Sequence, residues 1–164
     1  DGIRKALELD PSHETARQTL VALLAEQGRI EAAQTVLAEG LELNPRNVPF
    51  ALLLARLTLE NGNNEGALAV LMKHAEAGRS NAQYRGLVAA VLQRTGRHAE
   101  AVAEYSAALQ MAPHMGTWWM GLGLSQQALA ATKDAADSFE RAKASGSLNS
   151  DMVGYVDQRI KSLK

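Results

Sequence analysis

Cysteine is absent from this chain of 164 residues, which excludes disulfide bonds, thiolate metal sites and cysteine nucleophiles. Long apolar runs are absent as well. Arg56 interrupts the richest apolar segment, residues 48–59, which is shorter than the roughly 18 residues that a membrane-spanning helix needs. Neither charge is in excess, with 17 basic and 18 acidic side chains. This balance argues against a general nucleic-acid binder or a binder of anionic membranes, and we expect no direct membrane insertion.

Aromatic residues are scarce, with two Trp, three Tyr and two Phe. In their place the chain has 29 alanines and 23 leucines, close to a third of its length. Alanine and leucine are the strongest helix formers, whereas the residues that favour strands are few. The composition therefore predicts an all-α protein.

Proline is also rare, but the positions of the prolines are informative. Three of the four follow similar segments: LELDP ends at Pro11, LELNP at Pro45 and LQMAP at Pro113. The first two prolines are 34 residues apart and the next two are 68 apart, which is twice that spacing. The spacing indicates an internal repeat.

A period of 34 residues aligns several columns of the sequence. One column is alanine throughout, one is bulky, and one marks a turn with glycine or, in the last copy, alanine. The columns are Ala33, Ala67, Ala101 and Ala135; Leu37, Leu71, Tyr105 and Phe139; and Gly28, Gly62, Gly96 and Ala130. Apolar residues recur at three- and four-residue spacing, so each unit is predicted to be a pair of amphipathic helices. First helices are expected at 14–27, 48–61, 82–95 and 116–129, and second helices at 31–43, 65–77, 99–111 and 133–145.

The segment Trp119-Met-Gly-Leu-Gly123, followed by Ala135-x-x-x-Phe139, resembles the signature of the tetratricopeptide repeat (TPR). The resemblance implies an all-α TPR solenoid of antiparallel helix pairs, wound as a right-handed superhelix. We expect one TPR domain over residues 1–164, with a C-terminal capping helix predicted from the apolar stripe that begins at Met152. Its parts are a partial repeat (1–13), four repeats (14–47, 48–81, 82–115 and 116–149) and the cap (150–164).

Departures from the TPR pattern lead to two expectations. His74 replaces a small residue and Arg79 replaces a proline, so the second repeat is expected to end irregularly near residues 74–80. Residues 1–13 resemble the closing half of a repeat, so we expect a fragment of a longer protein. An uncapped half-repeat of this kind would favour self-association.

No catalytic or metal-binding motif is recognisable. The four histidines are scattered and form neither an HExxH run nor an H-x-x-x-H pair, and no glycine-rich phosphate loop is present. We therefore expect neither an enzyme nor a cofactor.

The TPR resemblance implies that the first helices line a concave groove for a protein or peptide partner. The groove positions, carried over residue by residue together with one flanking tryptophan, are Gln18, Leu52, Arg56, Leu59, Gln83, Ala90, Gln93, Arg94, Trp118, Met120, Leu124 and Gln127. The apolar members indicate a strip for a partner's apolar side chains or helix, unless the helix pairs shield them. Trp118 is either a binding aromatic or, as we favour, packed on the second helix of the preceding repeat.

Charge offers a further interpretation. Arg79, Arg85, Arg94 and Arg97 lie in a stretch without acidic residues. They fit an acidic partner segment or, more simply, a solvated face.

The segment Thr117-Trp-Trp-Met-Gly-Leu-Gly123 and the closing residues 146–163 resemble the C-terminal TPR region of type IV pilus biogenesis proteins of the mannose-sensitive haemagglutinin (MSHA) system. That resemblance implies a scaffold on the periplasmic side of the bacterial inner membrane that binds another pilus-assembly component. The alternatives are a cytosolic TPR adaptor or the substrate-recruiting arm of a larger enzyme.

Overall fold

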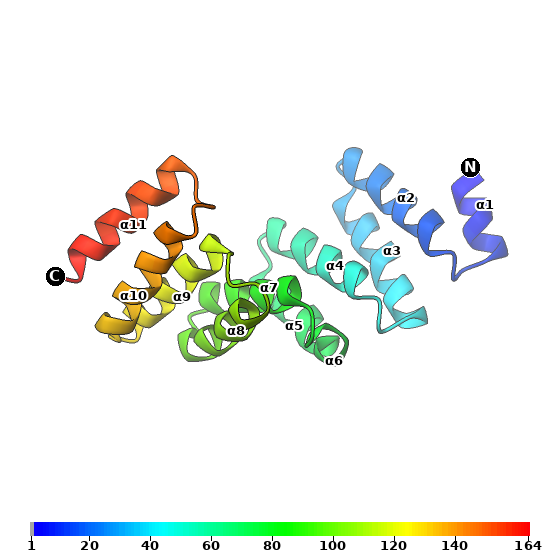
Figure 1. Cartoon of the computed structure of the whole chain (residues 1–164). Helices are drawn as coiled ribbons and strands as arrows, with labels where there is room; N and C mark the ends of the chain where they lie inside the picture. The colour runs from blue at the N-terminus through cyan, green and yellow to red at the C-terminus, as the bar shows by residue number, and fades with distance from the viewer. Residues whose placement is uncertain (1) are drawn as a thin grey trace. The chain divides into compact units, whose positions relative to one another are not determined.

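The computed structural model describes residues 2–164, and every regular element in that range is a helix (Figure 1). The helices are α1 (Gly2–Leu9), α2 (Glu14–Glu26), α3 (Ile30–Leu43), α4 (Val48–Glu60), α5 (Asn64–Lys73), α6 (Ala75–Gly78), α7 (Ala82–Arg94), α8 (His98–Met111), α9 (Gly116–Ala128), α10 (Thr132–Ala144) and α11 (Ser150–Ser162). The all-α prediction is confirmed. Seven of the eight predicted repeat helices begin and end within one residue of the observed bounds.

The exception is the second helix of the second repeat, which is broken where the sequence predicts it. Helix α5 ends at Lys73, and the four-residue α6 follows His74. In the other repeats the position of His74 is held by Gly40, Ala108 and Ala142, all of them small and buried. An imidazole needs more room than these residues, so a straight helix cannot pass through this close contact.

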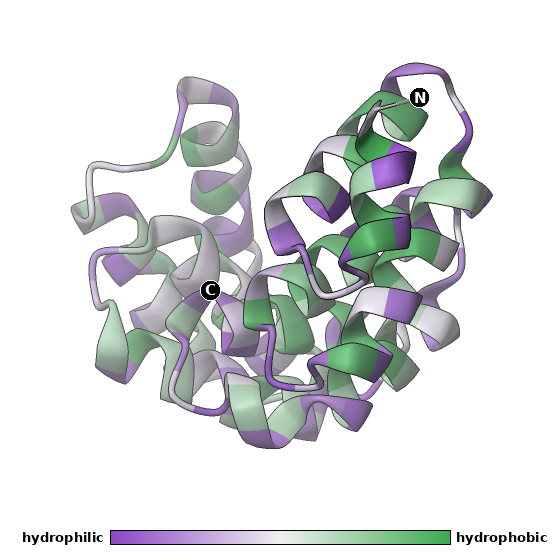
Figure 2. Cartoon of the chain, turned by 90° about the vertical axis from the view of Figure 1, so that its right-hand side faces the viewer, coloured by the Kyte–Doolittle hydropathy of each residue, from purple (hydrophilic) through white to green (hydrophobic). Residues whose placement is uncertain are grey.

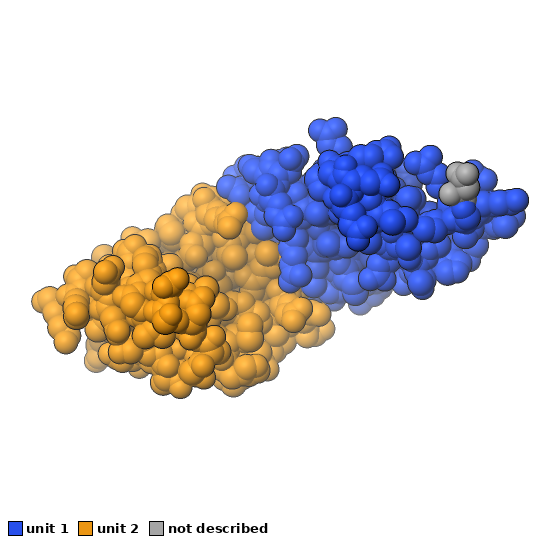
Figure 3. All heavy atoms as spheres, turned by 90° about the horizontal axis from the view of Figure 1, so that it is seen from above, with its two compact units in different colours: residues 1–78 blue, residues 79–164 orange. Residues whose placement is uncertain are grey.

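The chain divides into two compact units, residues 1–78 and 79–164 (Figure 3). In the first unit α1 packs on α2, α2 on α3, α3 on α4 and α4 on α5. In the second unit α7 packs on α8, α8 on α9, α9 on α10 and α10 on α11. Each unit is thus a succession of neighbouring helices that pack in sequence order. The single TPR domain over residues 1–164 stays a prediction.

The turn inside each pair needs a left-handed backbone. Gly28, Gly62 and Gly96 adopt φ values of +71°, +81° and +77°, and Ala130 adopts +59° in the fourth copy. Glycine adopts this conformation without the Cβ clash that other residues suffer. The glycine column therefore records a backbone requirement, which Ala130 meets with strain.

The aligned columns form the core. The four alanines at 33, 67, 101 and 135 are fully buried, and Leu37, Leu71, Tyr105 and Phe139 are buried beside them. Where helices approach most closely, glycine makes room: a Cβ added at Gly123 would lie 2.7 Å from the ring of Phe139. Most helices carry both apolar and polar stretches, and the connecting loops are mostly polar (Figure 2).

Three repeats share a hydrogen bond that the sequence pattern does not suggest. The side chain of the fourth residue of the first helix, an arginine or a tryptophan, donates a hydrogen bond to the backbone carbonyl six residues before it. This carbonyl lies at the corner between two repeats. The pairs are Arg17 Nη2 with Pro11 O (2.9 Å), Arg85 Nε with Arg79 O (2.6 Å) and Trp119 Nε1 with Pro113 O (2.8 Å).

In the second repeat a different side chain makes the hydrogen bond to the corner carbonyl. Ala51 occupies the donor position and has no side-chain donor, and the corner carbonyl of Pro45 is bonded instead to Nδ1 of His74, at 2.9 Å. His74 is itself buried. The residue that breaks the second helix thus replaces the missing corner donor.

Candidate partner-binding surfaces

The first helices of the pairs in the N-terminal unit, α2 and α4, present two of the predicted groove residues to solvent. Gln18 on α2 and Arg56 on α4 are exposed. Within residues 2–164 neither side chain makes a hydrogen bond or an ion pair. An unpaired guanidinium can bind a carboxylate through two parallel hydrogen bonds, so Arg56 is suited to an acidic ligand group.

The predicted apolar strip is not an exposed surface. Leu52 is only 8% exposed, and Leu59, Met120 and Leu124 are each partly buried. The large apolar side chains that are exposed lie elsewhere. The interpretation that the helix pairs shield these positions is therefore the better one for Leu52.

In the C-terminal unit, Trp118 is half-buried against α7. A Cβ added at Gly86 would lie 2.5 Å from Cε2 of the indole, so the indole ring occupies the space that a side chain at position 86 would need. The indole thus contacts the first helix of the preceding repeat, and the packing on the second helix that we favour from the sequence stays a prediction. Ala90 is half-buried on α7, whereas Gln83 and Arg94 are exposed, without a side-chain hydrogen bond or ion pair in the described part of the chain.

Gln93 is engaged inside its own unit. Its Nε2 donates to the carbonyl of Gly121 at 2.7 Å and to Oγ of Ser125 at 2.8 Å. The hydroxyl of Tyr105 donates to Oε1 at 3.3 Å, and burial raises the pKa of that tyrosine to about 12. All of the amide's polar atoms are therefore used to join α7 to α8 and α9.

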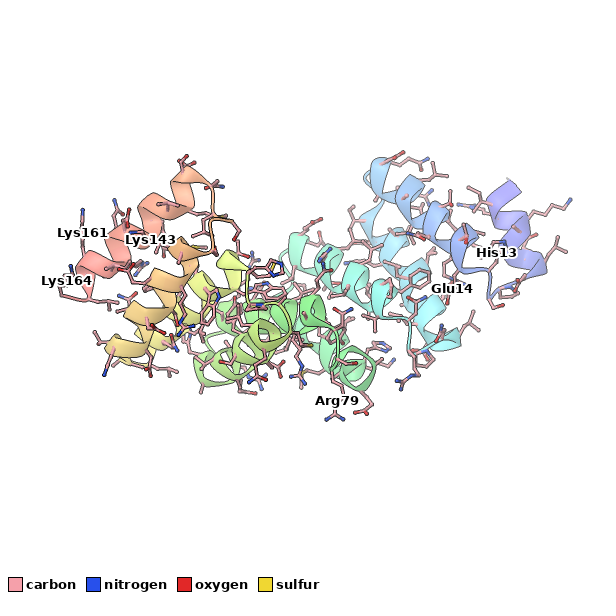
Figure 4. All side chains as sticks on the ribbon, viewed as in Figure 1. His13, Glu14, Arg79, Lys143, Lys161 and Lys164 are labelled. Carbon is pink, nitrogen blue, oxygen red and sulfur yellow. The ribbon has the colours of Figure 1, made fainter. Side chains whose placement is uncertain are left out.

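The arginine-rich stretch is mostly paired. Arg85 Nη1 lies 3.0 Å from Glu104 Oε2, and Arg97 Nη2 lies 2.7 Å from Glu100 Oε2. The backbone carbonyl of Arg79 accepts the hydrogen bond from Arg85 Nε. Arg79, labelled in Figure 4, is the first residue of the second unit. The guanidinium of Arg94 is therefore the group in this stretch that is available to pair with an acidic partner.

Helix α11 covers the remaining predicted groove residues, all on α9. Met120 and Leu124 pack against a buried cluster formed by Val156 of α11 and by Ala135 and Phe139 of α10, and we call the surface of Ala135 and Phe139 the α11 seat. Gln127 bonds to Ser162 and Arg159 of α11, each at 3.4 Å. These positions contact the chain's own C-terminal helix, which is the predicted capping helix.

Other surfaces were not predicted. A column of exposed apolar residues lies at the repeat corners: Leu9, Leu43 and Met111, with Leu43 56% exposed. The segments LELDP, LELNP and LQMAP contain this column, so the 34-residue period of these segments could have predicted it. A hollow of about 390 Å³ also opens between α3 and α4, lined by Glu31, Gln34, Thr35, Ala38, Leu54, Thr58, Asn61 and Asn63.

Helix α1 has no buried residue, and Leu9 at its end is the most exposed large apolar side chain among those described. A hollow of about 250 Å³ lies beside it, lined in part by Ile3, Leu20 and Leu23. His13 and Glu14 follow at the start of α2 (Figure 4). Self-association through this half-repeat stays a prediction.

The described part of the chain contains no cluster of three or more His, Asp or Glu residues able to hold a metal ion. Among the helices of residues 2–164, none has the length and apolarity that a bilayer crossing requires.

The repeat geometry agrees with comparisons to known families. Two family models, each described as tetratricopeptide repeat, match residues 35–91 and 89–150. Together they span more than two thirds of the chain. The chain belongs to the tetratricopeptide repeat family. Neither of these TPR models describes a catalytic family.

Solved structures share this TPR fold. A crystal structure of MamA has a TM-score of 0.77 at 17% identity, covering 88% of this chain and 84% of that chain. MamA residues 41 to end from Desulfovibrio magneticus RS-1 gives 0.77 at 14% identity, with coverages of 91% and 88%. YrrB, described as a TPR protein with an unusual peptide-binding site, gives 0.76 at 15% identity, with coverages of 88% and 75%. No curated protein sequence matches.

Proposed function

We propose that this TPR chain is a protein-interaction scaffold that binds an acidic peptide segment through polar side chains on its first helices. The proposal rests on the exposure of four predicted groove residues and on their lack of a partner within the described chain. Gln18, Arg56, Gln83 and Arg94 are exposed, and their side chains have no hydrogen bond or ion pair within residues 2–164. Polar groups that the fold does not use are available to a partner.

The two arginines determine the chemistry of the proposed partner. Arg56 lies on the first unit, whose residues 1–78 carry seven basic and eleven acidic side chains. Arg94 lies on the second unit, where residues 79–164 carry ten basic and seven acidic side chains. Carboxylates on a peptide would bind each guanidinium at its own site, and electrostatic attraction to the second unit would assist the approach. The peptide-binding site described for the TPR protein YrrB supports a peptide as the ligand class.

We further propose that the partner is a component of an MSHA-like type IV pilus machine, and that the chain acts on the periplasmic side of the bacterial inner membrane. This proposal rests on the resemblance of residues 117–123 and 146–163 to pilus biogenesis proteins. It is independent of the chemistry proposed for Arg56 and Arg94.

Charge reversal tests the binding surface. Wild type, Arg56→Asp, Arg94→Asp and the matched control Arg46→Asp would each be used to isolate partners from bacterial envelope extracts, with quantitative mass spectrometry as the readout. Arg46 is exposed and lies in the loop between α3 and α4, before the first helix that carries Arg56. We expect a partner whose recovery falls with Arg56→Asp or Arg94→Asp and is unchanged with Arg46→Asp.

Equal recovery of every partner with all four proteins would contradict binding through these arginines. Recovery of a charge-dependent partner that is not a pilus component would contradict the pilus assignment and leave the scaffold function standing.

A further inference from the structure

Helix α11 rests on a surface that belongs to the last repeat. Val156 is the one residue of α11 that is buried, and it packs against Ala135 and Phe139 of α10. Around this α11 seat lie Met120 and Leu124 of α9 and, from the C-terminal segment, Leu148, Ile160 and Leu163. The surface therefore accepts an amphipathic helix through aliphatic side chains spaced three or four residues apart.

Polar contacts at the rim fix the position of the helix. Lys143 Nζ lies 2.6 Å from Asp157 Oδ1, and the hydrogen bond to Asp157 raises the pKa of Lys143. Lys143 lies beside α11 in Figure 4, and Lys161 and Lys164 mark the end of that helix. On the other side Gln127 bonds to Arg159 and Ser162. These contacts are partly exposed to solvent, where ion pairs add little stability but do select which helix fits.

Helix α11 has fewer buried residues than the helices α9 and α10 beside it. Helix α11 has a single buried residue among thirteen, whereas α9 has five and α10 has four. Gly154 lies in its middle, with no atom near enough to require a glycine, and an interior glycine lowers helix stability. Segments with few buried contacts open locally at low cost.

The linker before α11 is anchored independently of the helix. Ser147 Oγ accepts from the backbone N–H of Gly116 at 2.9 Å and donates to the carbonyl of His114 at 3.3 Å. Gly146, with φ at +68°, forms the bend that precedes it. The helix can therefore leave the seat while the linker keeps its attachment to α9.

We propose that α11 is a displaceable cap, and that the seat beneath it binds a helix from a partner protein. The partner helix has the chemistry that the seat already accepts: aliphatic residues in the places of Val156, Ile160 and Leu163, an acidic residue that pairs with Lys143, and a hydrogen-bond donor for Gln127. The proposal adds a second, regulated binding surface to the proposed scaffold function and rests on that function only for the existence of a partner.

A synthetic, fluorescently labelled peptide of residues 149–164 serves as the probe, because it carries this chemistry. The chain has no cysteine, so Lys143→Cys combined with Asp157→Cys gives two unique thiols. A bifunctional thiol reagent about as long as the lost lysine side chain then locks α11 in place. Fluorescence anisotropy would measure peptide binding to the same double variant before and after linking.

We expect saturable binding to the unlinked double variant, because the partly exposed ion pair of Lys143 that it lacks adds little stability, and no binding after linking. A peptide with Val156→Asp and Ile160→Asp should not bind either protein. In the full chain, Gly154→Ala stabilises the helical cap without altering the seat and should weaken peptide binding by about fivefold. Absence of binding to the unlinked protein, or equal binding to the linked one, would overturn the proposal.

A stable dimer of the wild-type chain formed by exchange of α11, detected by light scattering without peptide, would also overturn it, because the occupant would then be a second copy. The test leaves Arg56 and Arg94 untouched. Failure of peptide exchange and failure of acidic-peptide binding therefore give separate results.

Discussion

Replacing His74 tests whether this residue substitutes for the corner donors of the other repeats. His74→Leu keeps a side chain of similar size and removes the hydrogen bond from Nδ1 to the carbonyl of Pro45, which spans 2.9 Å. Pro45 is exposed, so water can partly replace the lost donor and the cost should be near the lower end of its range, about 1 kcal/mol. His74→Ala also removes the packing of a side chain that is only 7% exposed. We expect about 2–3 kcal/mol for the alanine variant.

Urea unfolding followed by far-UV circular dichroism measures these differences. His74→Asn places an amide donor close to the position of Nδ1 and should retain more stability than His74→Leu. The matched control is His114→Leu, at an exposed histidine, which should change the free energy of unfolding by less than about 0.5 kcal/mol. If His74→Leu is as stable as wild type, or His74→Asn is no better than His74→Leu, the reasoning is refuted.

Three further predictions follow from the packing and the backbone. Ala130→Gly should raise the free energy of unfolding by about 1 kcal/mol by relieving the positive φ, whereas Ala131→Gly, at negative φ, should not raise it; equal effects in urea unfolding would contradict the strain. Gly123→Ala should lower stability by about 1–3 kcal/mol, because the added methyl meets the ring of Phe139; a thermal melt unchanged from wild type would count against this close approach. Burial raises the pKa of Tyr105 to about 12, so its neutral form stabilises the fold below pH 10 and this contribution is lost from about pH 10 to 12. Burial raises the pKa of Tyr84 to about 12 as well, so Tyr105→Phe should reduce the loss of stability over that range without abolishing it, and an unaltered profile would refute the assignment.

The positions of the helices could be predicted from the sequence because the repeat combines several independent signals. Columns of alanine, bulky residues and turn glycine recur every 34 residues, and each column records a local requirement: close approach, core filling or positive φ. His74 violates the small-residue column, and the break in the second helix follows from that violation. Each of these signals depends on one residue and its immediate neighbours in the chain.

The binding surface was less predictable because exposure depends on what packs over a helix. Leu52 occupies a groove position and is nevertheless buried, and Met120 lies beneath α11. The role of Gln93 depends on which carbonyl and hydroxyl face it across helices, which no spacing along one helix specifies. Arg56 was predicted by position alone, and its exposure and lack of an internal partner are properties that only the folded chain reveals.

Site-specific photo-crosslinking in living cells tests the central claim most directly. A photoreactive amino acid would be placed at position 56 on α4 and, in a separate variant, at position 46 in the loop before it. If the first-helix surface binds a protein partner, irradiation should give a discrete crosslinked product from position 56 and none from position 46. Absence of a product at position 56, or the same product from both positions, would contradict the proposal that this TPR chain binds its partner through that surface.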